Sequence, residues 1–361
     1  MLKIVEFINA NPNWKELIQK KPYCIEIKEA DDLILLKYDQ INSDFSNEMV
    51  RECRGIILTD TPLHVPVCIP FFKFGNYGES YCPEIDWASA RVQEKIDGSL
   101  IKVWWYNGEW RVSTNGSIDA YKAEIKNVLT ITDEKFKTFG DLFDEAKKNA
   151  GLDFNRLDQT RTYMFELISP YNKIVVPYKE TTLYHIGTRD RWTYEEFNED
   201  IGVQKPKEYN LHTLEDCIKA TKVMPFNEEG YVVVDKNWNR IKIKSPAYVA
   251  AHHLKGNGEP NILSLIELIR VNETEEFLNY FPEYRQVVEV YENKIENIIN
   301  ELDKNIRELY GIRFETQKDF ALAVKDLPFA SYYFLWKQKG TLPRDWFWSL
   351  TNNKIKEILS K

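Results

Sequence analysis

The stretch Glu94-Lys95-Ile96-Asp97-Gly98-Ser99 contains the residues best suited to chemistry, because it places a lysine beside a carboxylate and a glycine. An amine attacks phosphorus only when it is deprotonated, so a nucleophilic Lys95 needs a dry pocket or nearby cations that lower its pKa. A surface hairpin in which Lys95 and Asp97 face water fits the same short pattern. Other parts of the chain have to decide between these two interpretations.

Two stretches before Lys95 could bind an anion. Arg54 and Gly55 stand directly before an apolar run at 56–58. This suits a guanidinium that reaches into a pocket, although a surface arginine fits equally well. Residues 70–79 surround Lys73 with aromatic side chains and glycines. Such a run either stacks a base and holds a phosphate or belongs to the core.

Three stretches after Lys95 carry further candidates. Glu166 stands inside the apolar run 162–168, and a buried carboxylate needs a partner, either in a functional site or in a structural ion pair. Glu229 precedes a glycine and a second β-branched run. Lys242 and Lys244 alternate with isoleucines, so they point to one face of a strand. There they either grip a triphosphate and lower the pKa of Lys95 or face solvent.

The elements that must position these residues change in kind along the chain. Before Pro246 the pattern predicts a helix around 2–19 and helix-like runs at 120–128 and 133–149. It also predicts short strands at 23–27, 33–38, 91–94, 100–106, 109–113, 162–168, 173–176, 183–187, 231–234 and 240–244. After Pro246 the runs have helical spacing, at 248–254, 263–271, 275–280, 284–310, 316–324 and 354–359. We therefore expect an α+β domain at 1–245, with antiparallel sheets and helices, and an all-helical domain at 246–361.

Composition limits the class of protein. With 361 residues and 43% hydrophobic content, the chain is long enough for two domains with buried cores. It has no run of roughly 20 apolar residues and no signal-peptide pattern, which predicts a cytoplasmic protein without a membrane anchor. Its five cysteines show no zinc-binding spacing. The net charge of −8 excludes nucleic-acid binding by bulk attraction, so a local cationic cluster must hold any polyanion.

In their order along the chain, these motifs resemble those of the covalent nucleotidyltransferases, which include ATP-dependent DNA and RNA ligases and mRNA capping enzymes. Lys95-Ile96-Asp97-Gly98 is similar to the lysine motif of that family, Phe165-Glu166 to the third motif and residues 183–189 to the segment after it. Glu229-Gly230 is similar to the fourth motif and Lys242-Ile243-Lys244 to the fifth.

Within the family, the chain is most similar to the T-even phage single-strand RNA ligases of the tRNA-repair type. The added features are Arg54-Gly55, Lys73-Phe74, Ser169-Pro170 and the helical tail. The likeness covers about 23–248 by motif, whereas the tail matches only in length and helical character. The resemblance implies a nucleotidyltransferase domain of the ATP-grasp-like ligase type, followed by a helical domain that determines RNA-end specificity.

The resemblance also implies a reaction, that of an RNA ligase (ATP). Lys95 attacks the α-phosphate of ATP, the AMP passes to an RNA 5′-phosphate, and a 3′-hydroxyl then expels AMP. The implied catalytic residues are Lys95, Lys242 and Lys244. The residues that the resemblance implies for nucleotide binding are Glu94, Lys95, Ile96, Asp97, Gly98, Arg54, Lys73, Glu166, Glu229, Val232, Lys242 and Lys244. Val232 and a residue of 183–186 would form the apolar walls of the adenine pocket. We expect the cationic side chains to be partly exposed, and Glu166 and Glu229 to be partly buried.

The cofactors and partners follow from the same resemblance. Glu166 and Glu229 would bind Mg²⁺, for which Mn²⁺ could substitute. The partner would be RNA, as single-stranded ends or ends in a tRNA anticodon loop, and the protein would be a monomer in the cytoplasm of a phage-infected host cell.

One position departs from the family pattern. Where the relatives carry a basic residue before Gly116-Ser117, this chain has Asn115, which can donate a hydrogen bond but adds no charge. Either another cation takes that role, with Lys122 as a candidate, or the site works with fewer charges. The alternatives are a nick-sealing RNA or DNA ligase, a GTP-dependent capping guanylyltransferase and an inactive nucleic-acid-binding relative. The helical tail argues against DNA ligase and capping enzyme. Asn115 is the one feature that favours the inactive relative, and the joint presence of Lys95, Asp97, Glu166, Glu229, Lys242 and Lys244 argues against it.

Overall fold

The computed structural model describes residues 2–40, 42–125, 136–254, 261–270, 274, 278 and 282–360. It divides into two compact units, Met1–Tyr248 and Val249–Lys361. The predicted boundary at 245/246 lies at the start of helix α6 (Pro246–Leu254), and the division between the units lies inside that helix. No helix in the described ranges is long and apolar enough to span a membrane.

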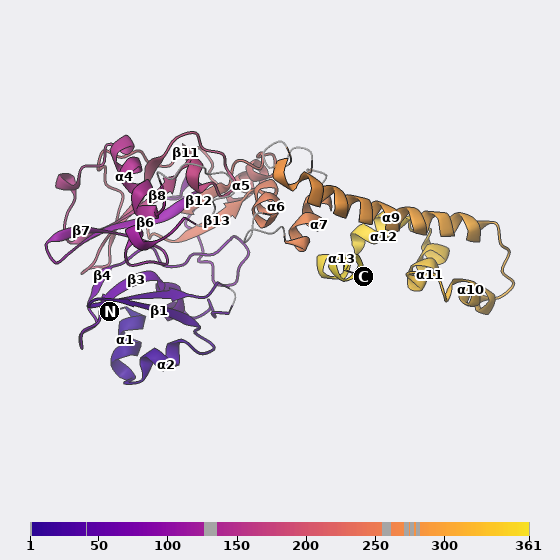
Figure 1. Cartoon of the computed structure of the whole chain (residues 1–361), viewed down its shortest axis with the longest axis horizontal. Coiled ribbons are helices and arrows are strands. Elements are labelled where there is room, and N and C mark those ends of the chain that lie inside the picture. The colour runs from indigo at the N-terminus through magenta and orange to yellow at the C-terminus, as the bar shows by residue number, and fades with distance from the viewer. Residues whose placement is uncertain are drawn as a thin grey trace. The chain divides into compact units, whose positions relative to one another are not determined.

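The first sheet of the first unit is antiparallel and has four strands in sequence order: β1 (Ile25–Ala30), β2 (Leu33–Tyr38), β3 (Arg54–Thr59) and β4 (Pro66–Cys68). Helices α1 (Lys3–Ala10), α2 (Trp14–Ile18) and α3 (Glu48–Glu52) share an apolar core with it (Figure 1). The helix predicted over 2–19 is thus two helices, interrupted at Asn11–Asn13. Strand β3 begins at Arg54, so the first candidate arginine stands at a strand end.

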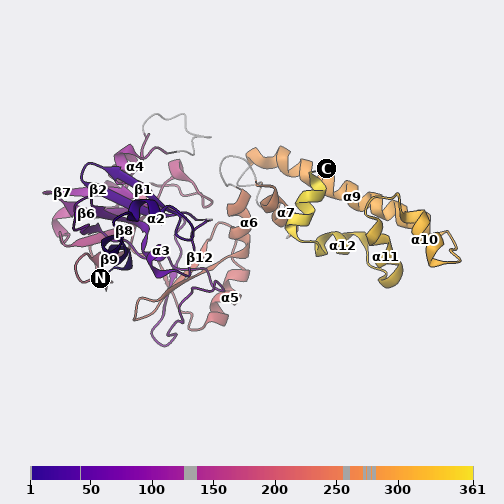
Figure 2. The same cartoon turned by 90° about the horizontal axis from the view of Figure 1, so that it is seen from below.

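The second sheet carries Glu166. Its strand order is β10 (Glu196–Phe197), β9 (Thr182–Asp190), β8 (Arg161–Ile168), β6 (Ser99–Tyr106) and β7 (Glu109–Thr114), all antiparallel. Asn107 and Gly108 turn β6 into β7 with positive φ angles of 48° and 83°, as the tight-turn pattern predicts. Helix α4 (Phe139–Ala150) packs on β8 and β9 and begins with a capping box from Thr138 (Figure 2).

The segment before α4 differs from the predicted helix. Residues Ala120–Lys122 form a single 3₁₀ turn, η1, and residues 126–135 lie outside the described ranges. Two further 3₁₀ turns, η2 (Phe154–Arg156) and η3 (Pro170–Asn172), flank β8. The strand predicted at 173–176 is wrong, because residues 174–176 form bends, and the N–H groups of Val175 and Val176 donate to the Asp97 carboxylate.

The third sheet carries the predicted phosphate-binding lysines. Its order is β11 (Glu208–Tyr209), β5 (Arg91–Glu94), β12 (Gly230–Val234) and β13 (Arg240–Lys244), all antiparallel. One face is apolar and packs with helix α5 (Leu214–Lys222), through residues that include Val92, Tyr231, Val233, Ile241 and Ile243. Because side chains alternate along a strand, the opposite face carries Gln93, Val232, Lys242 and Lys244.

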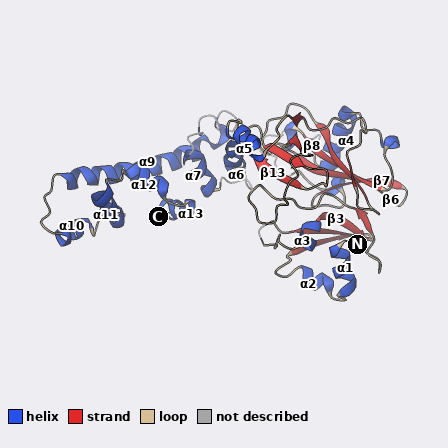
Figure 3. Cartoon of the chain, turned by 180° about the vertical axis from the view of Figure 1, so that it is seen from behind, coloured by secondary structure: helices blue, strands red, loops and turns tan. Residues whose placement is uncertain are grey.

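The described elements of the second unit are all helical after α6 (Figure 3). They are α7 (Ile262–Arg270), the 3₁₀ turn η5 (Pro282–Tyr284), α9 (Arg285–Tyr310), α10 (Gln317–Val324), α11 (Ala330–Lys339), α12 (Pro343–Ser349) and α13 (Asn352–Leu359). Helices α7, α12 and α13 pack along α9 around Ile266, Ile295 and Phe347 (Figure 2). The run predicted at 275–280 lies almost wholly outside the described residues. Helices α11 and α12 were not predicted, since their sequences are aromatic on more than one face.

Candidate active site

The segment Lys95–Gly98 connects two sheets. Strand β5 ends at Glu94 and belongs to the third sheet, whereas β6 begins at Ser99 and belongs to the second. The backbone N–H of Lys95 donates to the carbonyl of Gly230 at 2.9 Å, which ties the segment to β12. At Gly98 an added Cβ would lie 2.4 Å from the Leu167 carbonyl oxygen, so only glycine fits against β8. The predicted strand end at Lys95 is confirmed, but the two strands do not form a surface hairpin.

Lys95 lines a cavity of about 180 Å³. Sequence reasoning had selected nine of its lining residues: Arg54, Glu94, Lys95, Ile96, Glu166, Glu229, Val232, Lys242 and Lys244. The strand register of the third sheet brings some of these residues together. Val232 on β12 pairs with Gln93 on β5 and with Lys242 on β13, so the three residues form a row across the sheet. Residues from all three sheets therefore meet at one cavity.

Glu229 bridges two of the lysines. Its Oε2 lies 2.8 Å from Lys95 Nζ and its Oε1 lies 3.4 Å from Lys244 Nζ. The carboxylate side chain is 5% exposed, so these ion pairs are shielded from water. The buried charge of Glu229 is compensated from both sides, and Lys95 is held in place by it.

The electrostatics of Lys95 differ from the expectation. Burial by itself would lower the pKa of Lys95, but the carboxylates of Glu229 and Glu166 outweigh burial, and its pKa is raised. Another lysine on this cavity, Lys242, has a pKa that falls to about 6 through burial and then through the charges of Arg54 and Lys95. In the unliganded protein the cations therefore act mainly on Lys242, and the carboxylates dominate at Lys95.

Arg54 and Glu166 lie on other walls of the cavity. The Arg54 guanidinium is 5.3 Å from the centre of the Phe74 ring, and Lys242 Nζ is 4.9 Å from the same centre. Burial raises the pKa of Glu166 to about 7, against the lowering effect of Lys95. Arg54, Lys242 and Lys244 are partly exposed and Glu166 is partly buried, as predicted.

Asp97 lies behind the cavity wall and does not line the cavity. Asp97 is buried, with 3% of its surface exposed. One carboxylate oxygen accepts from the N–H groups of Val175 and Val176 at 2.8 and 2.7 Å, and the other accepts from the Tyr248 hydroxyl at 2.7 Å. These contacts hold the segment that follows Lys95, so Asp97 has a structural role here. Gly98 likewise does not line the cavity.

Lys73 is also placed differently from the expectation of partial exposure. It is 8% exposed, and its Nζ stands 4.1 Å and 5.0 Å from the ring centres of Phe45 and Tyr38. Burial lowers its pKa. Lys73 lines a neighbouring hollow of about 190 Å³ that shares Phe74 and Arg240 with the Lys95 cavity. Aromatic rings from outside the run 70–79 therefore cover the lysine.

Sequence reasoning missed several lining residues, of which Arg240 is the most polar. It forms an ion pair with Glu196 at 2.6 Å and lies 4.0 Å from the centre of the Phe71 ring. The alternation that selected Lys242 and Lys244 also includes Arg240, which was a usable signal. The others are Phe71, Phe74, Gln93 and Pro206, together with Ile186, which lies in the segment predicted to form an apolar wall.

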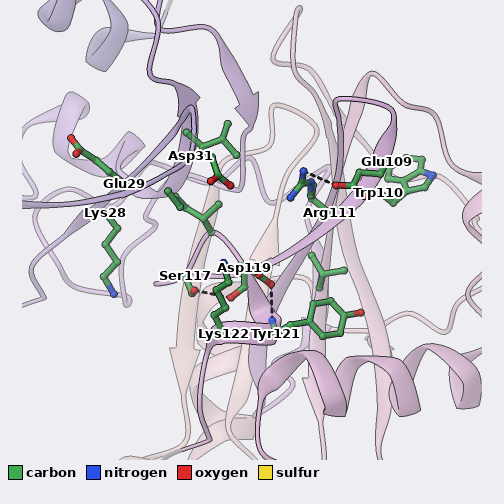
Figure 4. A pocket seen from close by; sticks show the side chains of 14 residues that line it. Lys28, Glu29, Asp31, Glu109, Trp110, Arg111, Ser117, Asp119, Tyr121 and Lys122 are labelled. Atoms are coloured by element: carbon green, nitrogen blue, oxygen red, sulfur yellow. Dashed lines mark hydrogen bonds and ion pairs between the residues drawn. The ribbon is translucent and has the colours of Figure 1, made fainter.

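Lys122, the candidate replacement for a cation at Asn115, lies at another cavity. That cavity, of about 360 Å³, is enclosed by β1, β7 and the segment 117–122 (Figure 4). The Lys122 side chain is 79% exposed, and its Nζ is 3.9 Å from a carboxylate oxygen of Asp119. It does not line the Lys95 cavity, so this candidate was wrong in its placement.

Three carboxylate residues line the Lys95 cavity, Glu94, Glu166 and Glu229, and the sequence predicts the last two as metal ligands. Within the described ranges, no three His, Cys, Asp or Glu side chains gather in a geometry that could hold a metal ion. Glu166 and Glu229 suit a Mg²⁺ ion that takes one or two carboxylates and completes its shell with substrate phosphates and water. Of the two, Glu229 already contacts Lys95 and Lys244.

Comparison with known proteins gives relatives named as RNA ligases. The chain is 32% identical over 351 residues to a protein of Autographa californica nuclear polyhedrosis virus that is named as a candidate bifunctional polynucleotide kinase/RNA ligase. The match covers 92% of this chain and 49% of that protein, so the chain spans about half the length of this relative. It is 28% identical over 382 residues to an RNA ligase of Rhodothermus phage RM378, covering 86% of each. No protein-family model matches the chain.

Solved structures show lower similarity. An archaeal ATP-dependent RNA ligase has 11% identity over 82% of each chain, with a TM-score of 0.47. A Naegleria gruberi RNA ligase with pyrophosphate has 17% identity over 45% of this chain and 52% of that one, with a TM-score of 0.34. The sequence relatives thus define what this chain is similar to: viral and phage proteins named RNA ligase.

Proposed function

We propose that the chain is an ATP-dependent RNA ligase of the single-strand-joining, tRNA-repair type, which joins an RNA 5′-phosphate to a 3′-hydroxyl. The observation that carries the proposal is the position of the Lys95 amine, in one cavity with Arg54, Lys242 and Lys244. The proposal is further supported by similarity to proteins named RNA ligase along 92% of the chain.

In the first step, Lys95 Nζ attacks the α-phosphorus of ATP. A nitrogen–phosphorus bond forms, the bond from the α-phosphorus to pyrophosphate breaks, and lysyl-AMP remains. The amine must first lose a proton, and the Glu229 carboxylate, 2.8 Å from Nζ, is placed to accept it. Lys242 and Lys244 line the cavity on the same strand face, where they can neutralise charge that grows on the phosphate.

In the second step, the RNA 5′-phosphate takes AMP from Lys95, and the amine regains its proton. In the third step, a 3′-hydroxyl loses its proton to solvent and attacks the activated phosphate, so that a phosphodiester bond forms, the pyrophosphate linkage to AMP breaks and AMP leaves. Because all three steps are displacements at phosphorus, one set of cations can serve each of them. Lys242 and Lys244 are therefore proposed as catalytic residues together with Lys95.

The nucleotide would contact both polar and apolar walls. Val232 and Ile186 provide apolar surface for the base, while Arg54 and Glu166 lie on the nucleotide side. For Lys73 to contact phosphate, as we propose, the triphosphate has to extend into the hollow of about 190 Å³ that Lys73 lines.

Mg²⁺, or Mn²⁺ in its place, would neutralise the leaving pyrophosphate. Glu166 is the better of the two proposed ligands, because Glu229 is engaged by two lysines. Beyond the cavity, we propose that residues 249–361 recognise RNA ends, including those of a cleaved tRNA anticodon loop. A monomer in the cytoplasm of an infected cell remains our prediction for the protein's state and location.

The test is a joining assay with a 5′-phosphorylated single-stranded RNA, Mg²⁺ and ATP. The proposal expects circular or end-joined RNA with ATP and no product with GTP. Product from a nicked duplex but not from single strands would favour the nick-sealing alternative. A covalent protein adduct formed from GTP instead of ATP would favour capping chemistry, and no reaction with any of these substrates would support an inactive relative.

A further inference from the structure

Lys102 is a buried lysine that the proposed reaction does not use. It stands on β6, has 0% exposure and donates a hydrogen bond from Nζ to the Gly55 carbonyl. Its chain neighbours Ile101 and Val103 are also fully buried. In the described ranges, no carboxylate forms an ion pair with it. Burying an ammonium group is costly unless something compensates the charge, so an apolar side chain would be less costly at this position.

The surroundings of Lys102 connect it with the Lys95 cavity. Gly55 follows Arg54, adopts a φ of +76° and packs so closely that an added Cβ would meet the Asn115 carbonyl oxygen at 2.5 Å. Lys102 Nζ and Asn115 Oδ1 both lie within 3.1 Å of that same Cβ position. The amine therefore lies where the start of β3 meets the end of β7, directly behind the backbone that carries Arg54.

One donor and one acceptor at this junction are unpaired among the described residues, and of the two only the Arg54 donor could bind an anion. Arg54 Nη1 and Asn115 Oδ1 are buried and have no hydrogen-bond partner in the part of the chain that the structure describes. Burial lowers the pKa of Lys102, Cys68 opposes that effect, and Arg54 lowers the pKa further. An anion bound in front of Arg54 would therefore favour the charged form of Lys102 as well.

We propose that Lys102 is a positioning residue that supplies, from the neighbouring strand, the positive charge that Asn115 lacks. Its ammonium fixes the Gly55 backbone, so that the Arg54 guanidinium points into the cavity, and its charge adds to the attraction for nucleotide phosphates. Strand pairing makes this possible, because Lys102 is the register partner of Ser113, two residues before Asn115. The inference rests on the proposed function and identifies the phosphates of ATP as the ligand of this junction.

The test compares Lys102→Gln with a double variant. Glutamine retains a donor for the Gly55 carbonyl but removes the charge. K102Q therefore tests the charge of Lys102 separately from its hydrogen bond to Gly55. We expect the ATP concentration for half-maximal adenylylation to rise about tenfold or more, with a smaller change in the maximal rate. Adding Asn115→Lys to K102Q should restore most of the loss. The control is Lys122→Gln, an exposed lysine at the other cavity, which should leave both parameters unchanged.

Wild-type half-saturation in K102Q would overturn the proposal, and so would a failure of N115K to rescue it. If K102Q does not fold, as judged by circular dichroism, Lys102→Arg provides the second test. Arginine keeps the charge, so a folded K102R with a tenfold loss would also contradict the charge role. Equilibrium binding of inorganic tripolyphosphate, measured by calorimetry, is the independent readout. If the wild type binds tripolyphosphate but forms no lysyl-AMP, the proposed function fails, while the same variants still decide the role of Lys102.

Discussion

Lys95 Nζ and Glu229 Oε2 lie 2.8 Å apart, although 134 positions separate the two residues in the chain. The buried carboxylate stabilises the ammonium form of the amine that we propose as nucleophile. Pyrophosphate displacement requires the neutral amine, so the ion pair has to weaken when ATP binds. The protonation state of Lys95 should therefore control the rate of adenylylation, and the pH dependence of that rate can be measured.

Replacing Glu229 by glutamine should move the pH dependence of adenylylation to lower pH. Loss of the negative charge makes the ammonium form of Lys95 less stable, which lowers its pKa and increases the fraction of free amine at a given pH. We expect a displacement of at least about one pH unit in single-turnover rates at low ATP. Glu228→Gln, at the exposed neighbouring carboxylate, is the matched control. An unshifted profile in E229Q would mean that the ion pair does not set the reactivity of Lys95.

Removing either lysine of β13 should slow the reaction. Lys242→Ala and Lys244→Ala each delete an amine that we propose is cationic when it binds phosphate, since a bound anion favours the charged form. We expect adenylylation to fall on the order of 10²-fold or more. The rate is measured by incorporation of α-labelled AMP into protein. Lys236→Ala, whose side chain is 66% exposed, should retain the wild-type rate. Wild-type rates in K242A or K244A would remove them from the proposed phosphate-binding set.

The Asp97–Tyr248 hydrogen bond should contribute to stability more than to chemistry. Tyr248→Phe removes a 2.7 Å donor from a buried carboxylate, and hydrogen bonds to charged groups contribute about 1.5–3 kcal/mol. Denaturant unfolding should show a loss of that size. Tyr77→Phe is the control, since that residue is 51% exposed. Unchanged stability in Y248F would show that the segment after Lys95 does not depend on this contact.

His185 should make the fold less stable in mild acid. It is 2% exposed, and burial followed by Lys205 lowers its pKa from 6.5 to about 4. Between these values the unfolded chain binds a proton that the folded chain does not, so the free energy of unfolding falls as pH drops from 6.5 towards 4. The His185 contribution to this fall is at most about 3 kcal/mol.

His185→Gln tests this contribution in urea titrations between pH 4.5 and 7.5. The variant should flatten the pH dependence relative to wild type, whereas the exposed His212→Gln should not. Parallel curves for H185Q and wild type would assign the acid sensitivity to other groups.

Local signals predicted several parts of the site from sequence. The end of β5 before Lys95 follows from a β-branched run that meets Asp97-Gly98, and the shared face of Lys242 and Lys244 follows from the two-residue period of a strand. The Asn107-Gly108 turn is equally local. Each of these features depends on neighbours within a few positions.

Other parts of the site depend on distant contacts and could not be predicted. A linear pattern cannot tell that β5 and β6 lie in different sheets, or that Lys73 is enclosed by Tyr38 and Phe45. Lys102 stands in a strand where alternation gives no warning of a fully buried charge. The predicted direction of the Lys95 pKa shift was wrong because the sequence gives no distance to Glu229.

The most direct test of the account is the identity of the adenylylated residue. The protein is incubated with Mg²⁺ and ATP, digested and examined by mass spectrometry, with Lys95→Ala treated in parallel. We predict one AMP adduct, on the peptide that contains Lys95, and none in a K95A variant whose circular dichroism matches wild type. An adduct on Lys242 or Lys244, or labelling of K95A at the wild-type level, would contradict the assignment of Lys95 as the nucleophile.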